Sequence, residues 1–298
     1  MIIKNSALEK NAPLVATFLS LLLAIVKLTV GLMSGSIALL ASAIDSIMDM
    51  FISVINYLAL KISDKGPNEE FQYGYGKIEA IVATIEGVLI FCSGIYIIYM
   101  AVQNYIDQVK VAHLELSIGV MIFSLIIVFI LVSFLSYVVK KSNNLVIKAD
   151  MLHYKTDLYS NGAVLITLGI VYFSGIDWID SLFGVLIGLY IINEAKELIK
   201  EGGEVLLDKG LDKNEIKDIE EVFNEDKDVE AFHFLKTRES GKYKFVEVHL
   251  VVGRYISLMD AHVIADRVEE KIASLDKERN WHIMVHLDPV DDSLAHKF

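Results

Sequence analysis

Apolar residues in the 298-residue chain gather into six long runs, which are separated by short polar or charged stretches. A helix needs about 20 predominantly apolar residues to cross the hydrocarbon layer of a bilayer. All six runs are long enough, and they cover residues 12–33, 36–60, 79–105, 114–139, 147–173 and 178–199. The pattern therefore predicts a polytopic α-helical membrane protein with six transmembrane helices.

The pattern changes after Glu204, where polar residues become frequent and the apolar positions become periodic. Helical periodicity predicts helices over 212–224 and 257–274. Alternation and turn residues predict strands over 229–238, 243–252 and 281–287, the first two joined as a hairpin. The order αββαβ indicates a small α+β domain, ferredoxin-like or metallochaperone-like, whose helices cover one face of the sheet. We therefore predict two domains, 1–204 in the membrane and 205–298 outside it.

Composition agrees with a membrane protein that carries an acidic soluble domain. The chain is 54% hydrophobic with a mean hydropathy of +0.49, which is unusual for a soluble protein of this length. Its formal net charge is −12, a balance that argues against nucleic acid and favours cationic partners. The apolar stretch after Lys10 is too long for the apolar segment of a cleavable signal peptide. We therefore expect the N-terminus to stay in the cytoplasm.

The distribution of lysines between the loops predicts the orientation of the helices. With the N-terminus inside, one face of the membrane carries eight lysines and the other only Lys110; the eight are Lys4, Lys10, Lys61, Lys65, Lys77, Lys140, Lys141 and Lys148. Cytoplasmic loops carry the excess of basic residues. The expected product is a multi-pass protein of the bacterial inner (plasma) membrane with both termini in the cytoplasm.

Two pairs of ionisable residues lie deep within the apolar runs. Asp45 and Asp49 are four residues apart in the second run, as are His153 and Asp157 in the fifth, so each pair projects from one face of its helix. Counted along the helices, Asp45 lies roughly 13–14 Å from the outer end of its run, and His153 and Asp157 lie roughly 9–15 Å from the inner end of theirs. Both pairs therefore fall near the middle of a layer about 30 Å thick. Charge at that depth usually marks a functional site. Three carboxylates and one imidazole converging there would suit a tetrahedral zinc site, whereas isolated hydrogen-bonded polar residues are the simpler alternative.

Three segments resemble signatures of the cation diffusion facilitator family: residues 36–49 (SIALLASAIDSIMD), 73–79 (YGYGKIE) and 149–157 (ADMLHYKTD). The resemblance covers nearly the whole chain and is closest to the bacterial ferrous-iron and zinc efflux pumps of that family. It implies a homodimeric metal/proton antiporter that works by alternating access. It also implies that the transport site consists of Asp45, Asp49, His153 and Asp157.

Six of the eight histidines follow residue 204. Single surface histidines are usually solvated, but a cluster in an acidic domain more often binds metal. The resemblance implies a cytoplasmic zinc cluster that helps to hold the dimer, made of His233, His249, His262, His286 and Asp288. Leu287 stands where close relatives carry Gln, so it offers no side-chain ligand.

Three further features follow from the same resemblance or from depth. Relatives have a third metal site between the second and third runs, but Asn68, Phe71 and Tyr75 occupy the corresponding positions, so we expect that site to be absent. Lys77 and Asp208 match a charge pair of relatives, although two ordinary charges next to the membrane are almost as good an interpretation. Lys27 and Glu86 also lie deep in apolar runs, where they could snorkel or pair, and they receive no role.

These observations predict secondary active export of Zn²⁺ from the cytoplasm in exchange for protons, with Fe²⁺ or Cd²⁺ as further candidate substrates. Metal binding requires deprotonated ligands, so metal entry displaces protons, and histidine is the natural carrier near neutral pH. A divalent-cation channel is one alternative, but conduction favours weak, multiple sites. A membrane-embedded zinc enzyme is another, but a catalytic zinc keeps an open position and the chain has no H-E-x-x-H motif. We therefore expect a transporter and not an enzyme. The expected partners of this transporter are a second copy of the chain, metal ions, protons and lipid, with no nucleic acid.

Overall fold

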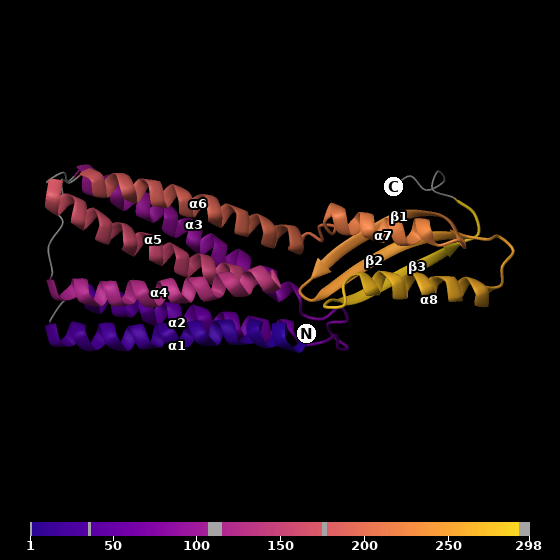
Figure 1. Cartoon of the computed structure of the whole chain (residues 1–298), viewed down its shortest axis with the longest axis horizontal. Coiled ribbons are helices and arrows are strands. Elements are labelled where there is room, and N and C mark those ends of the chain that lie inside the picture. Colours follow the sequence, from indigo (N-terminus) through magenta and orange to yellow (C-terminus); the bar gives the residue numbers. More distant parts are fainter. Residues whose placement is uncertain (1, 35–36, 107–114, 175–177, 292–298) are drawn as a thin grey trace. The chain divides into compact units, whose positions relative to one another are not determined.

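A computed structural model describes residues 2–34, 37–106, 115–174 and 178–291. The chain divides into two compact units, Met1–Gly74 with Ile78–Gly203, and Tyr75–Lys77 with Glu204–Phe298. Each of the six apolar runs forms a helix, and most of these helices extend beyond the run (Figure 1); their bounds are α1 Ile2–Ser34, α2 Ile37–Ser63, α3 Lys77–Ile106, α4 Glu115–Ser142, α5 Leu145–Ser174 and α6 Trp178–Leu206.

The six helices differ in how apolar they are. Within the described residues, four segments are long and apolar enough to cross a membrane: Leu8–Met33, Ser42–Ser63, Lys77–Ile106 and Gly119–Ser142. Helices α5 and α6 have 30 and 29 residues, so they are long enough to span, but each carries several charged residues. The six predicted helices are therefore confirmed, and four of them are apolar enough to cross a membrane. That α5 and α6 also cross it stays a prediction.

Helix α5 lies between two apolar cores of the first unit. Its residues Ile147 and Tyr154 pack with α1, α2 and α4, whereas Ala149 and Leu152 pack with α3 and α6. Helices α3 and α6 approach closely, because a Cβ atom at Gly188 would lie 2.9 Å from the carbonyl oxygen of Gly94. Small residues at such crossings are typical of helices that pack in membranes. Helix α5, which carries several polar side chains, therefore has other helices packed against it on two sides.

The second unit has the predicted order of elements: α7 Lys213–Glu225, β1 Val229–Ser240, β2 Tyr243–Val252, α8 Leu258–Leu275 and β3 Asn280–Asp288. The sheet has the order β1-β2-β3, in which β1 pairs antiparallel and β3 parallel with β2. Both helices pack on one sheet face, where Val246, Val248 and Leu250 meet Ile219 and Val268. The opposite face of β2 and β3 is left for polar side chains, including histidines.

An ion cluster joins the end of α7 to α8. Asp226 accepts two hydrogen bonds from Arg267, at 2.9 and 2.7 Å, and one from Lys271 at 2.9 Å. Burial of the Asp226 carboxyl opposes its ionisation, but the hydrogen bonds from Arg267 and Lys271 outweigh burial and hold its pKa at about 2. Because this pKa lies below the ordinary value of 3.8, the cluster stabilises the folded unit above about pH 4, and this stabilisation is lost as the pH falls towards 2.

Replacing Asp226 with asparagine should destabilise residues 205–298 by roughly 2 kcal/mol at pH 7, because the charge that orders Arg267 and Lys271 is lost. Urea unfolding of the isolated domain measures the effect, which should disappear near pH 2. Asp228 is the matched control: it also binds Arg267, at 2.7 Å, but its side chain is 55% exposed, so Asp228→Asn should cost much less. Equal effects of the two substitutions would contradict the assignment.

Candidate metal centres

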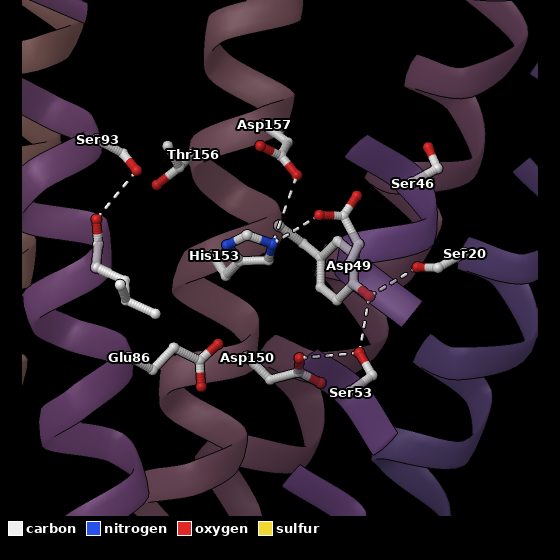
Figure 2. A network of polar contacts seen from close by, with 12 residues as sticks. Ser20, Ser46, Asp49, Ser53, Glu86, Ser93, Asp150, His153, Thr156 and Asp157 are labelled. Carbon is white, nitrogen blue, oxygen red and sulfur yellow. Dashed lines mark hydrogen bonds and ion pairs between the residues drawn. The ribbon is translucent and has the colours of Figure 1, made fainter. Parts of the chain in front are cut away.

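Three of the four predicted transport ligands meet between α2 and α5. The Nε2 atom of His153 lies 3.0 Å from Oδ1 of Asp49 and 3.9 Å from Oδ2 of Asp157. One ligand atom from each of the three lies within 4.8 Å of the others, a spacing that a single metal ion can bridge. Figure 2 shows both carboxylates pointing towards the imidazole ring. Because Asp157 is one helical turn beyond His153, the two α5 side chains present a common face to Asp49.

Asp45 lies one turn before Asp49 on α2 and is not part of this group of three. It lines the same cavity as Asp49 and Asp157, a space of about 320 Å³ bounded by α1, α2, α4 and α5. Lys27 lines this cavity too, and its Nζ donates a hydrogen bond of 2.8 Å to Oγ of Ser46. The cavity therefore contains the two carboxylates of the candidate metal centre, a third carboxylate from Asp45 and the side-chain nitrogen of Lys27.

Beneath the three ligands lies a layer of buried polar side chains (Figure 2). The hydroxyl of Tyr154 lies 2.7 Å from Ser20 Oγ and 2.8 Å from Ser53 Oγ, and Ser53 donates to Asp150 Oδ1 at 3.2 Å. Asn56 donates from one nitrogen to Asp150, at 3.1 Å, and to Glu86, at 3.2 Å. This network ties α1, α2, α3 and α5 together directly below the metal ligands.

Asp150 is the residue that the sequence analysis missed. It is fully buried, and it lies three residues before His153, so the same helical spacing that selected Asp157 also places Asp150 near that face. A search for charge in the apolar runs finds it, together with Glu86. Their association is not visible in the sequence, because it depends on how α3 packs against α5.

Four of the five predicted cytoplasmic ligands gather on the sheet of the second unit. Asp288 Oδ2 lies 2.9 Å from Nδ1 of His249 and 3.3 Å from Nε2 of His233, and its Oδ1 lies 3.2 Å from Nε2 of His286. His233, His249 and Asp288 form a group whose ligand atoms can hold one metal ion. His233 is nearly buried, whereas the side chain of His286 is 64% exposed.

Strand register explains this cluster. His233 pairs with His249, which in turn pairs with His286, so the three imidazoles form a row across β1, β2 and β3. An irregularity in β1 directly follows His233, where Phe234 has a φ of +53°. Such bulges re-aim side chains next to functional sites. His262 is not part of the row: it lies on α8 with its side chain 68% exposed and 3.8 Å from Asp266.

The remaining predicted positions lie near the start of α3. Lys77 Nζ lies 3.0 Å from Asp208 Oδ1 and also donates to the carbonyl oxygen of Leu206; both partners belong to the second unit. In the preceding loop, Asn68 Oδ1 accepts hydrogen bonds from the backbone N–H groups of Glu70 and Phe71, at 3.1 and 2.6 Å. Among the described residues, this loop contributes to neither group that can hold a metal ion.

Comparison with known proteins places both parts of the chain in one family. Residues 14–207 match the family described as "Cation efflux transmembrane domain", and residues 211–290 match "Cation efflux protein, cytoplasmic domain". The chain belongs to the cation efflux family, the cation diffusion facilitators. Among its relatives are the proteins named "Cation-efflux pump FieF" of Salmonella arizonae and Salmonella newport, each 33% identical over 282 residues, 95% of this chain and 93% of the relative.

A solved structure, the "Metal-bound C-terminal domain of CzcD transporter from Thermotoga maritima", is 20% identical and covers 28% of this chain and 98% of its own, with a TM-score of 0.25. The family assignment rests on the sequence matches. They confirm a multi-pass membrane transporter with a cytoplasmic domain, and they confirm the prediction that the chain is a transporter and not an enzyme.

Proposed function

We propose that this cation efflux protein exports Zn²⁺ from the cytoplasm in exchange for protons, with Fe²⁺ and Cd²⁺ as secondary substrates. The observation that carries the proposal is the group formed by Asp49, His153 and Asp157 between α2 and α5. One imidazole nitrogen with carboxylate oxygens is a ligand set that suits zinc and its neighbours better than magnesium or calcium.

Asp45 completes the proposed transport site. It lies on the same cavity one turn from Asp49, about 6 Å along the helix axis, so a modest change in α2 brings it to the metal as a fourth ligand. Four ligands fill the coordination shell of a zinc ion and leave no open position for catalysis. Such a site fits a carrier that binds its cargo fully and releases it after a conformational change.

Ligand chemistry supports exchange with protons. Zinc needs a neutral His153 and ionised carboxylates, so a metal ion and protons compete for the same atoms. In the proposed orientation, with both termini in the cytoplasm of a bacterial inner membrane, protons from the more acidic exterior displace the metal outward. Lys27 provides further positive charge in the same cavity, which favours release of a bound cation.

The cytoplasmic centre has the donor set of a zinc site, with three imidazoles around one carboxylate, and His233, His249, His286 and Asp288 would hold the ion. We assign it a part in holding a homodimer. The match to the cytoplasmic domain of the family supports this role, as does the exposure of His286 at the edge strand β3. His262 would join only through a rearrangement or from a second copy.

Zinc should strengthen dimerisation of residues 205–298, because a ligand that binds only the assembled form shifts the equilibrium towards it. Sedimentation equilibrium with and without zinc measures the change, and a chelator should reverse it. His249→Ala should abolish the response. His282→Ala is the control, since its ring contacts Phe245 edge to face, outside the cluster. A domain that dimerises equally with and without zinc would leave these histidines without a role in assembly.

Reconstitution tests the transport proposal itself. Purified protein in sealed vesicles should move Zn²⁺ saturably and should move protons in the opposite direction. Transport of Zn²⁺ without proton movement would remove the exchange mechanism while leaving the assignment to the family intact.

A further inference from the structure

A second buried acidic pair lies beside the proposed metal centre. Glu86 on α3 and Asp150 on α5 lie next to each other (Figure 2). Both accept a hydrogen bond from the same nitrogen of Asn56 on α2. Glu86 is 4% exposed and Asp150 is 0% exposed. Neither residue is one of the proposed metal ligands, and no part of the transport proposal uses them.

Each of these two carboxyl groups has an oxygen that lacks a partner. Glu86 Oε1 and Asp150 Oδ2 are buried and form no hydrogen bond with any residue that the structure describes. Within the same described residues, no lysine or arginine forms an ion pair with either side chain. Two adjacent ionised carboxylates, buried among apolar helices without a counter-ion, would be strongly unfavourable.

One bound proton reduces both the repulsion and the lack of hydrogen-bond partners. It removes one of the two negative charges, and it turns one of the two unpartnered oxygens into an O–H group that can donate a hydrogen bond. A metal ion fits this location less well, because it requires space and several ligand oxygens, whereas Asn56 directs its amide N–H groups at both carboxylates. Acid pairs of enzymes, in which two neighbouring carboxyl groups do not both ionise, follow the same electrostatic rule.

We propose that Glu86 and Asp150 form a proton-binding pair that holds one proton while the metal centre is empty and loses it when a divalent cation binds there. The inference rests on the proposed function, since it supplies one of the exchanged protons. The charged and titratable groups that act on the pair are Asp49 on α2, His153 on α5 and, through Ser53, Tyr154. Two positive charges arriving at Asp49 and His153 disfavour a proton on the pair.

A chain of hydroxyl groups connects the pair to the cavity. Tyr154 lines the cavity and hydrogen bonds to Ser53, and Ser53 donates to Asp150. Because Ser53 donates to Asp150, the hydroxyl of Tyr154 is the donor to Ser53. Each hydroxyl can pass its own proton to the next oxygen and receive one from the previous group. A proton taken from cavity water therefore arrives on Asp150, and Ser53 and Tyr154 end unchanged.

Infrared difference spectroscopy on the full-length protein, with zinc alone as the probe, tests the pair directly. At neutral pH, zinc should remove a carbonyl-stretch band of a protonated carboxyl group from the wild-type spectrum. The band should be absent from the E86Q/D150N double variant and retained in Glu194→Gln, whose carboxylate binds Lys155 instead. A wild-type spectrum in which zinc removes no such band overturns the proposal, whether or not the variants fold.

Calorimetry in two buffers of different ionisation enthalpy counts the protons released by zinc. The double variant should bind zinc and release about one proton fewer than the wild type. Unchanged proton release overturns the proton-binding pair but leaves the transport proposal standing, whereas a wild-type protein that binds no zinc defeats the transport proposal. Zinc that remains bound in D49A/D157A and is lost on adding E86Q would show that the pair binds metal, which also overturns the proposal.

Discussion

Replacing Asp49 or Asp157 with alanine should lower saturable Zn²⁺ transport by at least about 100-fold, since even loss of an outer-shell partner of a metal ligand typically costs 10–100-fold. Both carboxylates lie against the imidazole of His153, so either change removes one charged ligand and leaves an incomplete coordination shell. The measurement is the initial rate of zinc uptake into vesicles that contain equal amounts of each variant.

The control for this experiment is Glu197→Ala, which removes an exposed carboxylate from α6 and should leave the rate unchanged. Size-exclusion chromatography of each variant distinguishes loss of transport from loss of folding. Wild-type rates in either Asp49→Ala or Asp157→Ala would exclude these residues from the transport site. They would leave the family assignment intact, because that assignment rests on the whole chain.

Replacing His153 with aspartate should weaken discrimination of Zn²⁺ from Mn²⁺. Four carboxylates suit harder ions, whereas imidazole suits zinc and its neighbours, so the variant loses the borderline-soft ligand of the proposed set. The substitution also removes the imidazole, the side-chain type whose ordinary pKa lies closest to neutral pH. The pH dependence of transport should therefore move towards the acidic range in which carboxylates titrate. Initial rates for both metals, each measured over a series of external pH values, provide the two readouts.

His153→Asn is the matched variant, because it also removes the titrating imidazole but adds no negative charge. It should lose the pH response near neutrality without gaining manganese transport. If His153→Asp keeps the wild-type metal ranking and pH profile, the histidine is neither the selecting ligand nor the proton carrier. The proposal would then reduce to a divalent-cation exporter whose coupling is unexplained.

The depth of each ionisable residue along its helix could be predicted from the sequence. The neighbouring helix that its side chain faces could not. Counting residues from the helix ends placed the two pairs at similar depths, and the structure brings Asp49, His153 and Asp157 together. The same count treated Asp45 as their equal, although it lies a turn away on the wall of the cavity. Which side chains meet depends on the rotation and packing of α2 and α5, for which the sequence pattern provides no measure.

The second unit shows a similar limit. Alternation along each strand identified His249 and His286 as residues of the polar face, because a period of two is built into a strand. Their alignment with His233 depends on strand register and on the irregularity after His233, and neither follows from the pattern of any single strand. His262 was assigned by resemblance alone, and in the described single chain it lies on α8, away from the cluster.

The buried pair of Glu86 and Asp150 could not be predicted for a related reason. Each residue is visible in the sequence as a charge within an apolar run. Their association is not, because it requires one nitrogen of Asn56 on α2 to contact both α3 and α5. The order of the helices along the chain does not predict that contact. The contact depends on α3 packing against α5, where Ala83 and Ile90 share an apolar core with Ala149 and Leu152.

Proton counterflow in reconstituted vesicles tests the central claim most directly. The vesicles hold a pH-sensitive dye, an inward zinc gradient is imposed, and zinc and protons are followed together. The account predicts that zinc influx saturates, that protons leave in a fixed ratio to it, and that both fluxes vanish in Asp49→Ala. It also predicts that an imposed proton gradient drives zinc uphill. Zinc influx that does not saturate, or that proceeds without opposite proton movement, would contradict the account and indicate a channel.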